Sequence, residues 1–234
     1  MATDAALMES ATPGRAVWRW YDWTTPTVSF GRNEKVHGRF SEASVASAGL
    51  SAVRRPTGGR ALLHSREITY SATFCLDGHS GWREAYEAVN SMLHQILESL
   101  GLPVVLAGAQ APMAPDGPVC FDQPSEGELV VAGRKLVGSA VWRQGTQYLQ
   151  HGSILLHDDQ SRLAEAASVP LPPAPPAASL QELLPSLDRE TALDALDKAL
   201  ATRIDDVFQP SANLRSRIEE MEHDYSDPAR IWRR

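Results

Sequence analysis

The sequence predicts an α/β protein in which helices alternate with mostly antiparallel strands. Two observations predict this class. Apolar residues recur at helical spacing over residues 81–100, which is typical of an amphipathic helix. Three strand-like segments then follow one another at 128–131, 135–143 and 148–156, with turn residues between them. Consecutive strands joined by short turns run antiparallel, so this part of the chain is expected to form a meander.

The segment before the long helix is divided into short elements by turn and cap residues. Ser41 is a typical helix-capping residue and Gly49 a typical helix-ending residue, so a helix is expected between them. The predicted elements are, in chain order, a helix at 2–10, two short strands around the Thr25–Pro26 turn, the helix at 41–49, a strand at 51–55, a glycine turn at 56–59 and a long apolar strand at 68–76.

The segment after the long helix begins with a short strand at 104–108. A loop rich in proline and glycine follows and leads to Cys120. Residues 169–179 contain too much proline for a helix or a central strand, so they are expected to form a connector. Helices are predicted at 191–208 and 211–223.

The composition is that of an ordinary globular protein. Of 234 residues, 43% are hydrophobic and 22% are charged, which suits a single full core. One domain is therefore expected over residues 1–234, with the connector at 169–179 and a helical part at 180–234. The chain has no run of roughly 18 apolar residues that could span a membrane. The N-terminus lacks the pattern of a secretory signal, so we expect a cytoplasmic protein without a membrane partner.

The net charge of −7, from 22 basic and 29 acidic residues, argues against nucleic-acid binding. The charge is uneven along the chain. A local basic face would suit an acidic partner or a phosphate group, although an ordinary solvated surface explains the same residues equally well. The basic residues between positions 32 and 66 are Arg32, Lys35, Arg39, Arg54, Arg55, Arg60 and Arg66, against the acids Glu34 and Glu42.

The chain has two cysteines, Cys75 and Cys120, which cannot make a disulfide framework or a thiolate zinc site by themselves. Cys75 lies in an apolar run, so we expect an inert thiol in the core. Cys120 follows the proline- and glycine-rich loop, so its chemistry is more open.

A first candidate site is the sequence RRPTGGRALLH at 54–64. Its two arginines place positive charge beside a Thr-Gly-Gly turn, whose backbone N–H groups can approach a ligand closely because glycine has no side chain. An anion or a polarised carbonyl would suit this arrangement, but an ordinary turn has the same sequence. The candidate residues are Arg54, Arg55, Thr57, Gly58, Gly59 and His64.

Two further candidate sites follow in the meander. Alternation along the strand puts Lys135, Val137 and Ser139 on one face, with Leu136 and Gly138 on the other. A lysine among valines could donate a strong hydrogen bond to a carbonyl, or it could reach solvent from the strand end.

The histidine in Gln150-His151-Gly152 ends a turn and starts an apolar strand. It could take part in substrate positioning, but it also fits a structural histidine with satisfied partners.

Four motifs occur in the order in which one known protein family has them. They are RRPTGGRALLH at 54–64, EITYS around Tyr70, CFDQPSEGELVVAGRKLVGSA at 120–140 and LQHGSILL at 149–156. Together they closely resemble the family of lipoate-protein ligases and octanoyltransferases, which shares its fold with biotin-protein ligases. The resemblance implies an α/β fold with a mixed, mostly antiparallel sheet flanked by helices.

The resemblance extends to the branch that transfers octanoyl groups through a cysteine. Cys120 resembles the nucleophile of that branch, and Arg60 stands where typical ligases have a third glycine. By the same resemblance, we expect no accessory C-terminal domain of the kind that many ligases use. By resemblance, Cys120 and Lys135 are the expected catalytic residues. The expected substrate-binding residues are Arg54, Arg55, Thr57, Gly58, Gly59, His64, Tyr70, Gly138, Ser139, His151 and Gly152.

The same resemblance implies the partners. Octanoyl-acyl carrier protein is the expected donor, and a lipoyl domain or the glycine-cleavage H protein is the expected acceptor. No metal or other cofactor is expected, because a thioester is already activated. ATP and Mg²⁺ would be needed if the chain were instead an ATP-dependent lipoate-protein ligase. The resemblance also leaves open a lipoyl amidotransferase and a non-catalytic acyl-binding relative.

Overall fold

A computed structural model describes residues 1–77, 81–108 and 125–233. Its strands are β1 (Ala16–Tyr21), β2 (Thr27–Phe30), β3 (Ser51–Arg54), β4 (Leu62–His64), β5 (Glu67–Cys75), β6 (Val105–Leu106), β7 (Leu129–Val131), β8 (Arg134–Gln144) and β9 (Gln147–Leu155). Its helices are α1 (Ala2–Glu9), α2 (Glu42–Ser47), α3 (Trp82–Ser99), α4 (Leu163–Ala166), α5 (Leu180–Leu183), α6 (Arg189–Ala201), α7 (Ala212–Ser226) and α8 (Pro228–Ile231), with a 3₁₀ turn at Gln160–Arg162.

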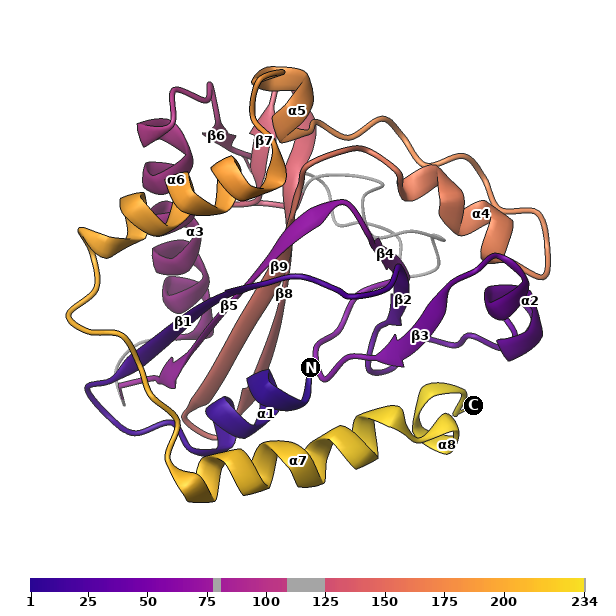
Figure 1. Ribbon diagram of the computed structural model, residues 1–234, viewed down its shortest axis with the longest axis horizontal. Coiled ribbons are helices and arrows are strands. Elements are labelled where there is room, and N and C mark those ends of the chain that lie inside the picture. The colour runs from indigo at the N-terminus through magenta and orange to yellow at the C-terminus, as the bar shows by residue number, and fades with distance from the viewer. Residues whose placement is uncertain (78–80, 109–124, 234) are drawn as a thin grey trace.

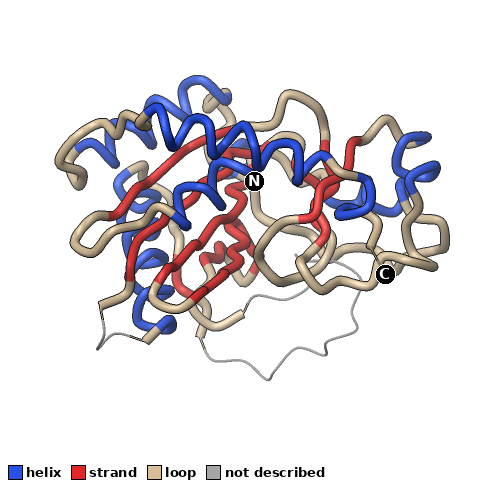
Figure 2. Tube along the Cα trace, turned by 90° about the horizontal axis from the view of Figure 1, so that it is seen from below, coloured by secondary structure: helices blue, strands red, loops and turns tan. Residues whose placement is uncertain are grey.

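The strands form two sheets that lie side by side along the long axis of the molecule (Figure 2). The larger sheet has the order β1-β5-β9-β8-β7-β6, and every neighbouring pair is antiparallel. The smaller sheet has the order β3-β2-β4, with β2 and β3 parallel. Helices α3 and α6 lie on one side of the larger sheet, and α1 and α7 lie on the other (Figure 1). This arrangement confirms the predicted mixed, mostly antiparallel sheet flanked by helices.

The predicted meander is confirmed as β7, β8 and β9, joined by turns with left-handed glycines at Gly133 and Gly145. The two short strands around Thr25–Pro26 are also present, but they belong to different sheets. β1 pairs with β5, whereas β2 pairs with β3 and β4. The chain therefore crosses from one sheet to the other between these two strands.

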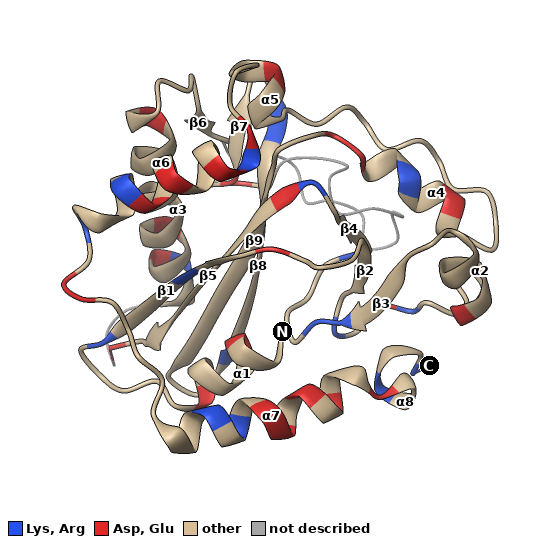
Figure 3. Cartoon of the chain, viewed as in Figure 1, with Lys and Arg blue, Asp and Glu red and all other residues tan. Residues whose placement is uncertain are grey.

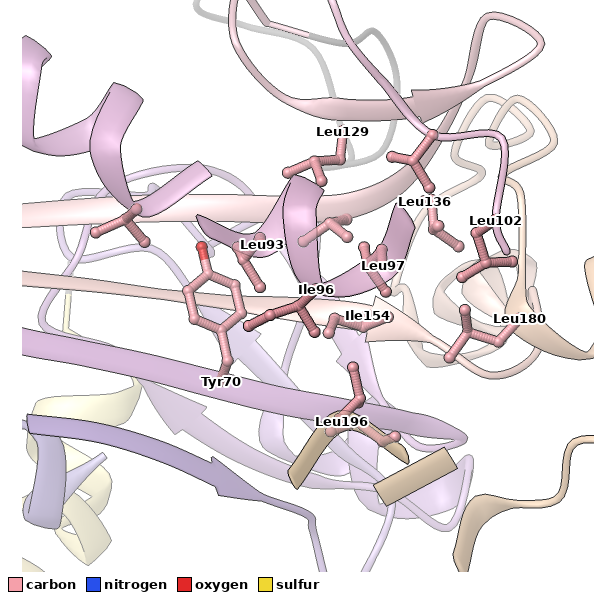
Figure 4. Packing of buried hydrophobic residues seen from close by; sticks show 14 of the residues in the cluster. Tyr70, Leu93, Ile96, Leu97, Leu102, Leu129, Leu136, Ile154, Leu180 and Leu196 are labelled. Carbon is pink, nitrogen blue, oxygen red and sulfur yellow. The ribbon is translucent and has the colours of Figure 1, made fainter. Parts of the chain in front are cut away.

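Helix α3 follows its predicted boundaries and supplies much of the core. Leu93, Ile96 and Leu97 are fully buried and point toward Tyr70 and Ile154 of the sheet (Figure 4). The helix ends before Gly101, whose φ of 80° is unfavourable for other residues. The apolar stripe of α3 is thus part of the core, as the sequence predicted.

Strand β5 is apolar on one face only. Ile68 and Tyr70 face the core beneath α3, whereas the alternate residues Glu67, Thr69 and Ser71 are buried on the opposite face. The prediction of a long apolar strand at 68–76 did not include this polar face. Buried polar side chains need hydrogen-bond partners, and those of Glu67 and Thr69 lie at the candidate site described below.

Two details of the sequence prediction are wrong. The helix expected at 191–208 ends at Ala201. Asp205 and Asp206 follow that end, where negative charge opposes the helix dipole. Cys75, expected in the core, is only half-buried, because it lies at the end of β5, where its thiol donates a hydrogen bond to the Ala11 carbonyl.

Within the described ranges 1–77, 81–108 and 125–233, every helix is too short or too polar to cross a lipid bilayer.

A close backbone approach fixes the Thr-Gly-Gly turn against the end of β2. A Cβ atom added at Gly31 would lie 1.9 Å from the carbonyl oxygen of Gly59. The Arg32 amide donates to the Thr57 carbonyl at 2.8 Å, and the Arg55 amide donates to the Phe30 carbonyl at 3.0 Å. Glycine at position 31 therefore allows the turn to pack directly on the backbone of β2.

We predict that Gly31→Ala lowers the free energy of unfolding by about 1–3 kcal/mol, because the new methyl group forces the turn away from β2. Urea unfolding followed by circular dichroism measures this change. Gly58→Ala is the matched control, since a Cβ atom there would have no heavy atom within 4 Å. Equal stability of the two variants would contradict the assigned role of Gly31.

Candidate active site

A narrow cavity lies between the two sheets, on the face of the larger sheet that carries α1. Six of the residues predicted from the sequence line it: Arg55, His64, Gly138, Ser139, His151 and Gly152. The cavity volume is about 20 Å³, which is room for roughly one water molecule. An acyl chain of several carbons is larger than this cavity, so it would enter only if the lining side chains moved.

Gly152 leaves space for the neighbouring Tyr70 ring and the β8 backbone. A Cβ atom at Gly152 would lie 2.3 Å from the Gly138 carbonyl oxygen and 2.5 Å from Cε1 of Tyr70. The Tyr70 hydroxyl forms a 2.6 Å hydrogen bond with Ser139 Oγ and accepts one of 2.8 Å from Gln150 Nε2. Burial raises the pKa of Tyr70 well above its ordinary value. Tyr70 is therefore a neutral structural support for the cavity wall.

His64 is held by partners on both ring nitrogens. Its Nδ1 lies 2.6 Å from Glu67 Oε1, and its Nε2 lies 2.8 Å from Ser29 Oγ. The Ser29 hydroxyl also accepts from Arg55 Nη1 at 2.9 Å. The ring also stacks on Trp23, with centroids 4.3 Å apart. These contacts make His64 a rigid wall of the cavity.

His151 has a parallel arrangement on the other side of the cavity. Its Nε2 lies 2.7 Å from Thr57 Oγ1, and its Nδ1 lies 3.3 Å from Asp4 Oδ2. Asp4 is itself fixed by an ion pair with Arg19 and by the Tyr21 hydroxyl at 2.8 Å. Burial lowers the pKa of His151 below its ordinary value. His151 is therefore a neutral side chain in the cavity wall. Both of its ring nitrogens have protein partners, which fits the interpretation of a structural histidine.

The guanidinium groups of Arg54 and Arg55 point inward. Arg55 donates to the Gly58 carbonyl, to the Arg60 carbonyl at 2.7 Å and to Ser29. These bonds close the Thr-Gly-Gly turn around the arginine, which still lines the cavity. Gly58 and Gly59 are exposed on the outer side of this turn.

Arg54 lies outside the cavity. Its guanidinium donates to backbone carbonyls of the 31–34 loop and of helix α8, including Gly31 at 2.7 Å and Ile231 at 3.0 Å. It is 1% exposed. The expectation that Arg54 meets a ligand or an acidic surface does not match this place, because its donors bind the C-terminal part of the chain.

A β-bulge sets the direction of Lys135. Leu129 of β7 pairs with Val137 and Val130 pairs with Lys135, so Leu136 is an extra residue in β8. Leu136 and Val137 both lie in the core cluster. Strict alternation is broken between them, and Lys135 falls on the same face as Gly138. The expected sharing of one face by Lys135, Val137 and Ser139 is therefore wrong.

The Lys135 ammonium is buried and paired with Glu128. Its Nζ lies 2.8 Å from Glu128 Oε2, and both side chains are at most 5% exposed. The sequence allowed Lys135 either to reach solvent from the strand end or to remain buried as a hydrogen-bond donor. Its burial excludes the first of these interpretations. Lys135 lies three residues from Gly138, or about 10 Å along the strand, which is comparable to an extended eight-carbon chain.

The expected basic face is not present as one surface. Arg54, Arg55 and Arg60 are buried, whereas Arg32 and Lys35 are exposed. The exposed Arg66 forms a 3.3 Å ion pair with Asp159. Figure 3 shows basic positions at several places along the chain around β3 and β4. Three of the arginines that the sequence assigned to a basic face are buried around the Thr-Gly-Gly turn, so their charges do not lie on the surface.

Cys120 lies outside the described residues. Among those that are described, no group of three His, Cys, Asp or Glu side chains is arranged to hold a metal ion.

Comparison with known proteins identifies the family of the chain. Residues 1–203 match the family model of the lipoyl protein ligase A/B catalytic domain. The chain belongs to this family. The family resemblance of the four sequence motifs is thereby confirmed, and the mixed α/β architecture fits it.

Relatives in the family include two octanoyltransferases named LipM. That of Anoxybacillus flavithermus is 41% identical over 175 residues, covering 70% of this chain and 63% of its own length. That of Kyrpidia tusciae is 40% identical over 174 residues, with the same coverage. The aligned part of the chain thus spans about 63% of the length of these relatives.

Solved structures in the family share the fold at lower identity. A lipoate-protein ligase A bound with ATP superposes with a TM-score of 0.81 at 18% identity, covering 99% of this chain and 92% of the other. A bipartite lipoate protein ligase of Thermoplasma acidophilum, described with its E2 lipoyl domain, superposes with a TM-score of 0.75 at 17% identity, covering 99% and 89%.

Four acidic or hydroxyl residues of the site were not predicted from the sequence. Glu67 lies three residues after His64, and its alternation with Thr69 along β5 is a signal that could have found it. Glu128 directly precedes the meander. Ser29 and Asp4 have no local signal, because Asp4 meets His151 across 147 positions of the chain.

We predict that His151 makes stability depend on pH. Burial favours its neutral form, so its contribution is present above the ordinary value of 6.5 and is lost as pH falls below it. Between about pH 7.5 and about pH 5.5, wild-type unfolding free energy should fall more than that of His151→Gln, whose side chain does not titrate. Urea unfolding at both pH values measures this difference.

His37→Gln is the control for that prediction, because His37 is exposed. Its pH dependence should match the wild type. If His151→Gln also matches the wild type, His151 is not held neutral by the fold.

Proposed function

We propose that this protein is an octanoyltransferase that moves an octanoyl group from acyl carrier protein, through a thioester on Cys120, to a lysine of a lipoyl-accepting protein. The observation that carries the proposal is 38–41% identity over about 70% of the chain to relatives named octanoyltransferase LipM. The two ligases of known structure described above are 18% and 17% identical, so their likeness supports the fold alone.

The proposed reaction consists of two acyl transfers. The Cys120 thiolate attacks the carbonyl carbon of the donor thioester, and the pantetheine thiolate of the carrier protein leaves. The neutral amine of the acceptor lysine then attacks the enzyme thioester. An amide forms, the Cys120 thiolate leaves, and the amine releases a proton. Both steps exchange one acyl bond for another, so they need no ATP, metal or redox cofactor.

Lys135 is proposed to stabilise the negative charge that develops on the acyl oxygen in both steps. A buried ammonium is a strong donor to such an oxygen, because little water competes with it. Its place about 10 Å along β8 from Gly138 would let the octanoyl tail extend toward the cavity. Gly152 and His151 would then contact the end of the tail.

The proposed partners follow from the same family. The T. acidophilum ligase is described with an E2 lipoyl domain, and we propose a lipoyl domain or the glycine-cleavage H protein as the acceptor here. Octanoyl-acyl carrier protein is the proposed donor. An ATP-dependent ligase, a lipoyl amidotransferase and a non-catalytic acyl-binding protein would each give a different result in the two experiments that follow.

We predict that octanoyl-acyl carrier protein modifies an apo lipoyl domain in the presence of this protein without ATP. Free octanoate with Mg-ATP should give no product. Mass spectrometry of the lipoyl domain measures both reactions. Product only from the free acid and ATP would establish a ligase, and transfer only from a lipoylated protein would establish an amidotransferase.

We further predict that incubation with octanoyl-acyl carrier protein adds one octanoyl mass to the enzyme, on the peptide that contains Cys120. Hydroxylamine should release it, as expected of a thioester. Cys120→Ala should lose at least about a hundredfold in turnover, because direct transfer lacks the covalent step.

Cys75→Ser is the matched control, since Cys75 lies at the end of β5. It should keep near wild-type turnover. Wild-type turnover by Cys120→Ala would exclude the thioester route, and the absence of both product and acyl-enzyme would favour a non-catalytic acyl-binding protein.

A further inference from the structure

We infer that Glu128 is a positioning residue for Lys135. It holds the ammonium at one place on β8 and keeps it charged in a buried site. The inference rests on the proposed function for its catalytic meaning, whereas the effect on the charge of Lys135 can be measured without turnover.

The pair is close, buried and fixed on the Glu128 side. Glu128 Oε2 lies 2.8 Å from Lys135 Nζ, and the exposures of the two side chains are 5% and 3%. The same oxygen accepts the Ser125 amide at 2.6 Å, and the Glu128 amide donates back to the Ser125 carbonyl at 3.0 Å. The carboxylate is therefore part of a closed turn at 125–128.

This turn is tied to the core from two sides. Asn90 of α3 donates to the Gly127 carbonyl at 2.9 Å, and the Ala107 amide donates to the Glu128 carbonyl at 2.8 Å. Gly127 has a φ of 78° and approaches the Tyr86 ring, where a Cβ atom would lie 3.3 Å from a ring carbon. A side chain at 127 would push the turn away, so glycine lets Glu128 reach Lys135.

A hydrogen-bonded network continues from the turn to the cavity. Asn90 Oδ1 accepts from Gln150 Nε2 at 2.8 Å, and Gln150 also donates to Tyr70, whose hydroxyl contacts Ser139 of the cavity wall. The elements that carry Glu128 and the cavity are thus held in register by buried hydrogen bonds. Such networks are rigid because each broken bond leaves a buried polar group without a partner.

The Glu128 contact favours the charged form of Lys135 for a physical reason. Burial disfavours an ammonium, and a carboxylate 2.8 Å away offsets that cost. Among the described residues, the buried Tyr70 of β5 also interacts electrostatically with Glu128 and with Tyr86 of α3, and burial raises the pKa of Tyr70. Arg134, the neighbour of Lys135, binds Glu182 at the surface instead.

Removal of the Glu128 charge should therefore let Lys135 lose its proton at lower pH. Glu128→Gln keeps the size of the side chain and an oxygen for the Ser125 amide, so it tests charge with little change in shape. A neutral lysine is a weaker donor to an oxyanion. We expect kcat to fall about tenfold or more, with little change in KM, and the alkaline decline of kcat to begin at lower pH.

The small number of lysines in the chain allows the protonation of Lys135 to be measured directly. The sequence has three lysines, Lys35, Lys135 and Lys198. Lys35 and Lys198 are exposed, so in protein labelled with ¹³C-lysine their Cε signals are internal references for the buried Lys135. We expect the Lys135 signal to titrate at lower pH in Glu128→Gln than in the wild type, while the other two signals titrate unchanged.

Glu182→Gln is the matched control, because it removes the charge of an exposed glutamate paired with the adjacent Arg134. It should leave both kcat and the Lys135 titration unchanged. Glu128→Asp keeps the charge with a shorter side chain, so it should keep the titration close to wild type and recover part of kcat. If Glu128→Gln does not fold, a Lys135 titration in Glu128→Asp that is shifted strongly from wild type although the charge is kept would contradict the charge role.

The outcomes separate this inference from the proposed function. A shifted Lys135 titration in a protein without octanoyl transfer would support the charge role of Glu128 and overturn the proposed function. Normal transfer with unchanged titration and unchanged pH dependence in Glu128→Gln would overturn the inference alone. If Glu128→Gln and Glu128→Asp lose kcat equally and the Lys135 titration is unchanged in both, Glu128 acts only through packing.

Discussion

The β-bulge at Leu136 is the constraint on which the candidate site depends. Without the extra residue, β8 would alternate strictly, and Lys135 would point into the core with Val137. The bulge puts two consecutive apolar residues into the core and leaves Lys135 on the face of Gly138. The ammonium and the cavity then lie on one side of the same strand. A single backbone irregularity thus makes the proposed chemistry geometrically possible.

The opposite end of the site depends on buried polar contacts around the cavity. His64 and His151 are each held between a hydroxyl and a carboxylate, from Ser29 and Glu67 in one case and from Thr57 and Asp4 in the other. These arrangements resemble catalytic relays in their groups, but every ring nitrogen of the two histidines is already occupied by a protein partner. Their physical effect is to hold two flat rings as walls of a narrow slot.

The division of charge in the site is consistent with the proposed acyl transfer. The described part of the cavity has buried arginine and histidine groups whose donors are bound to protein carbonyls and hydroxyls, as for Arg55. Lys135 differs, because it pairs with a side-chain carboxylate across the bulge. The site therefore combines the Lys135–Glu128 pair with a slot whose polar side chains are bound to protein partners.

The sequence by itself determined the elements that arise from local pattern. The helix at 81–100, the helix capped by Ser41 and the meander were predictable, because helical and strand periodicity depends on residues two to four positions apart. The motifs that identify the family were also local, and they named most residues that line the cavity. Only the tertiary structure decided which strand β1 pairs with, which arginines are buried and which partners His151 and Lys135 have. These features depend on surfaces brought together from distant parts of the chain, as when Asp4 meets His151, and no local pattern records which surfaces meet.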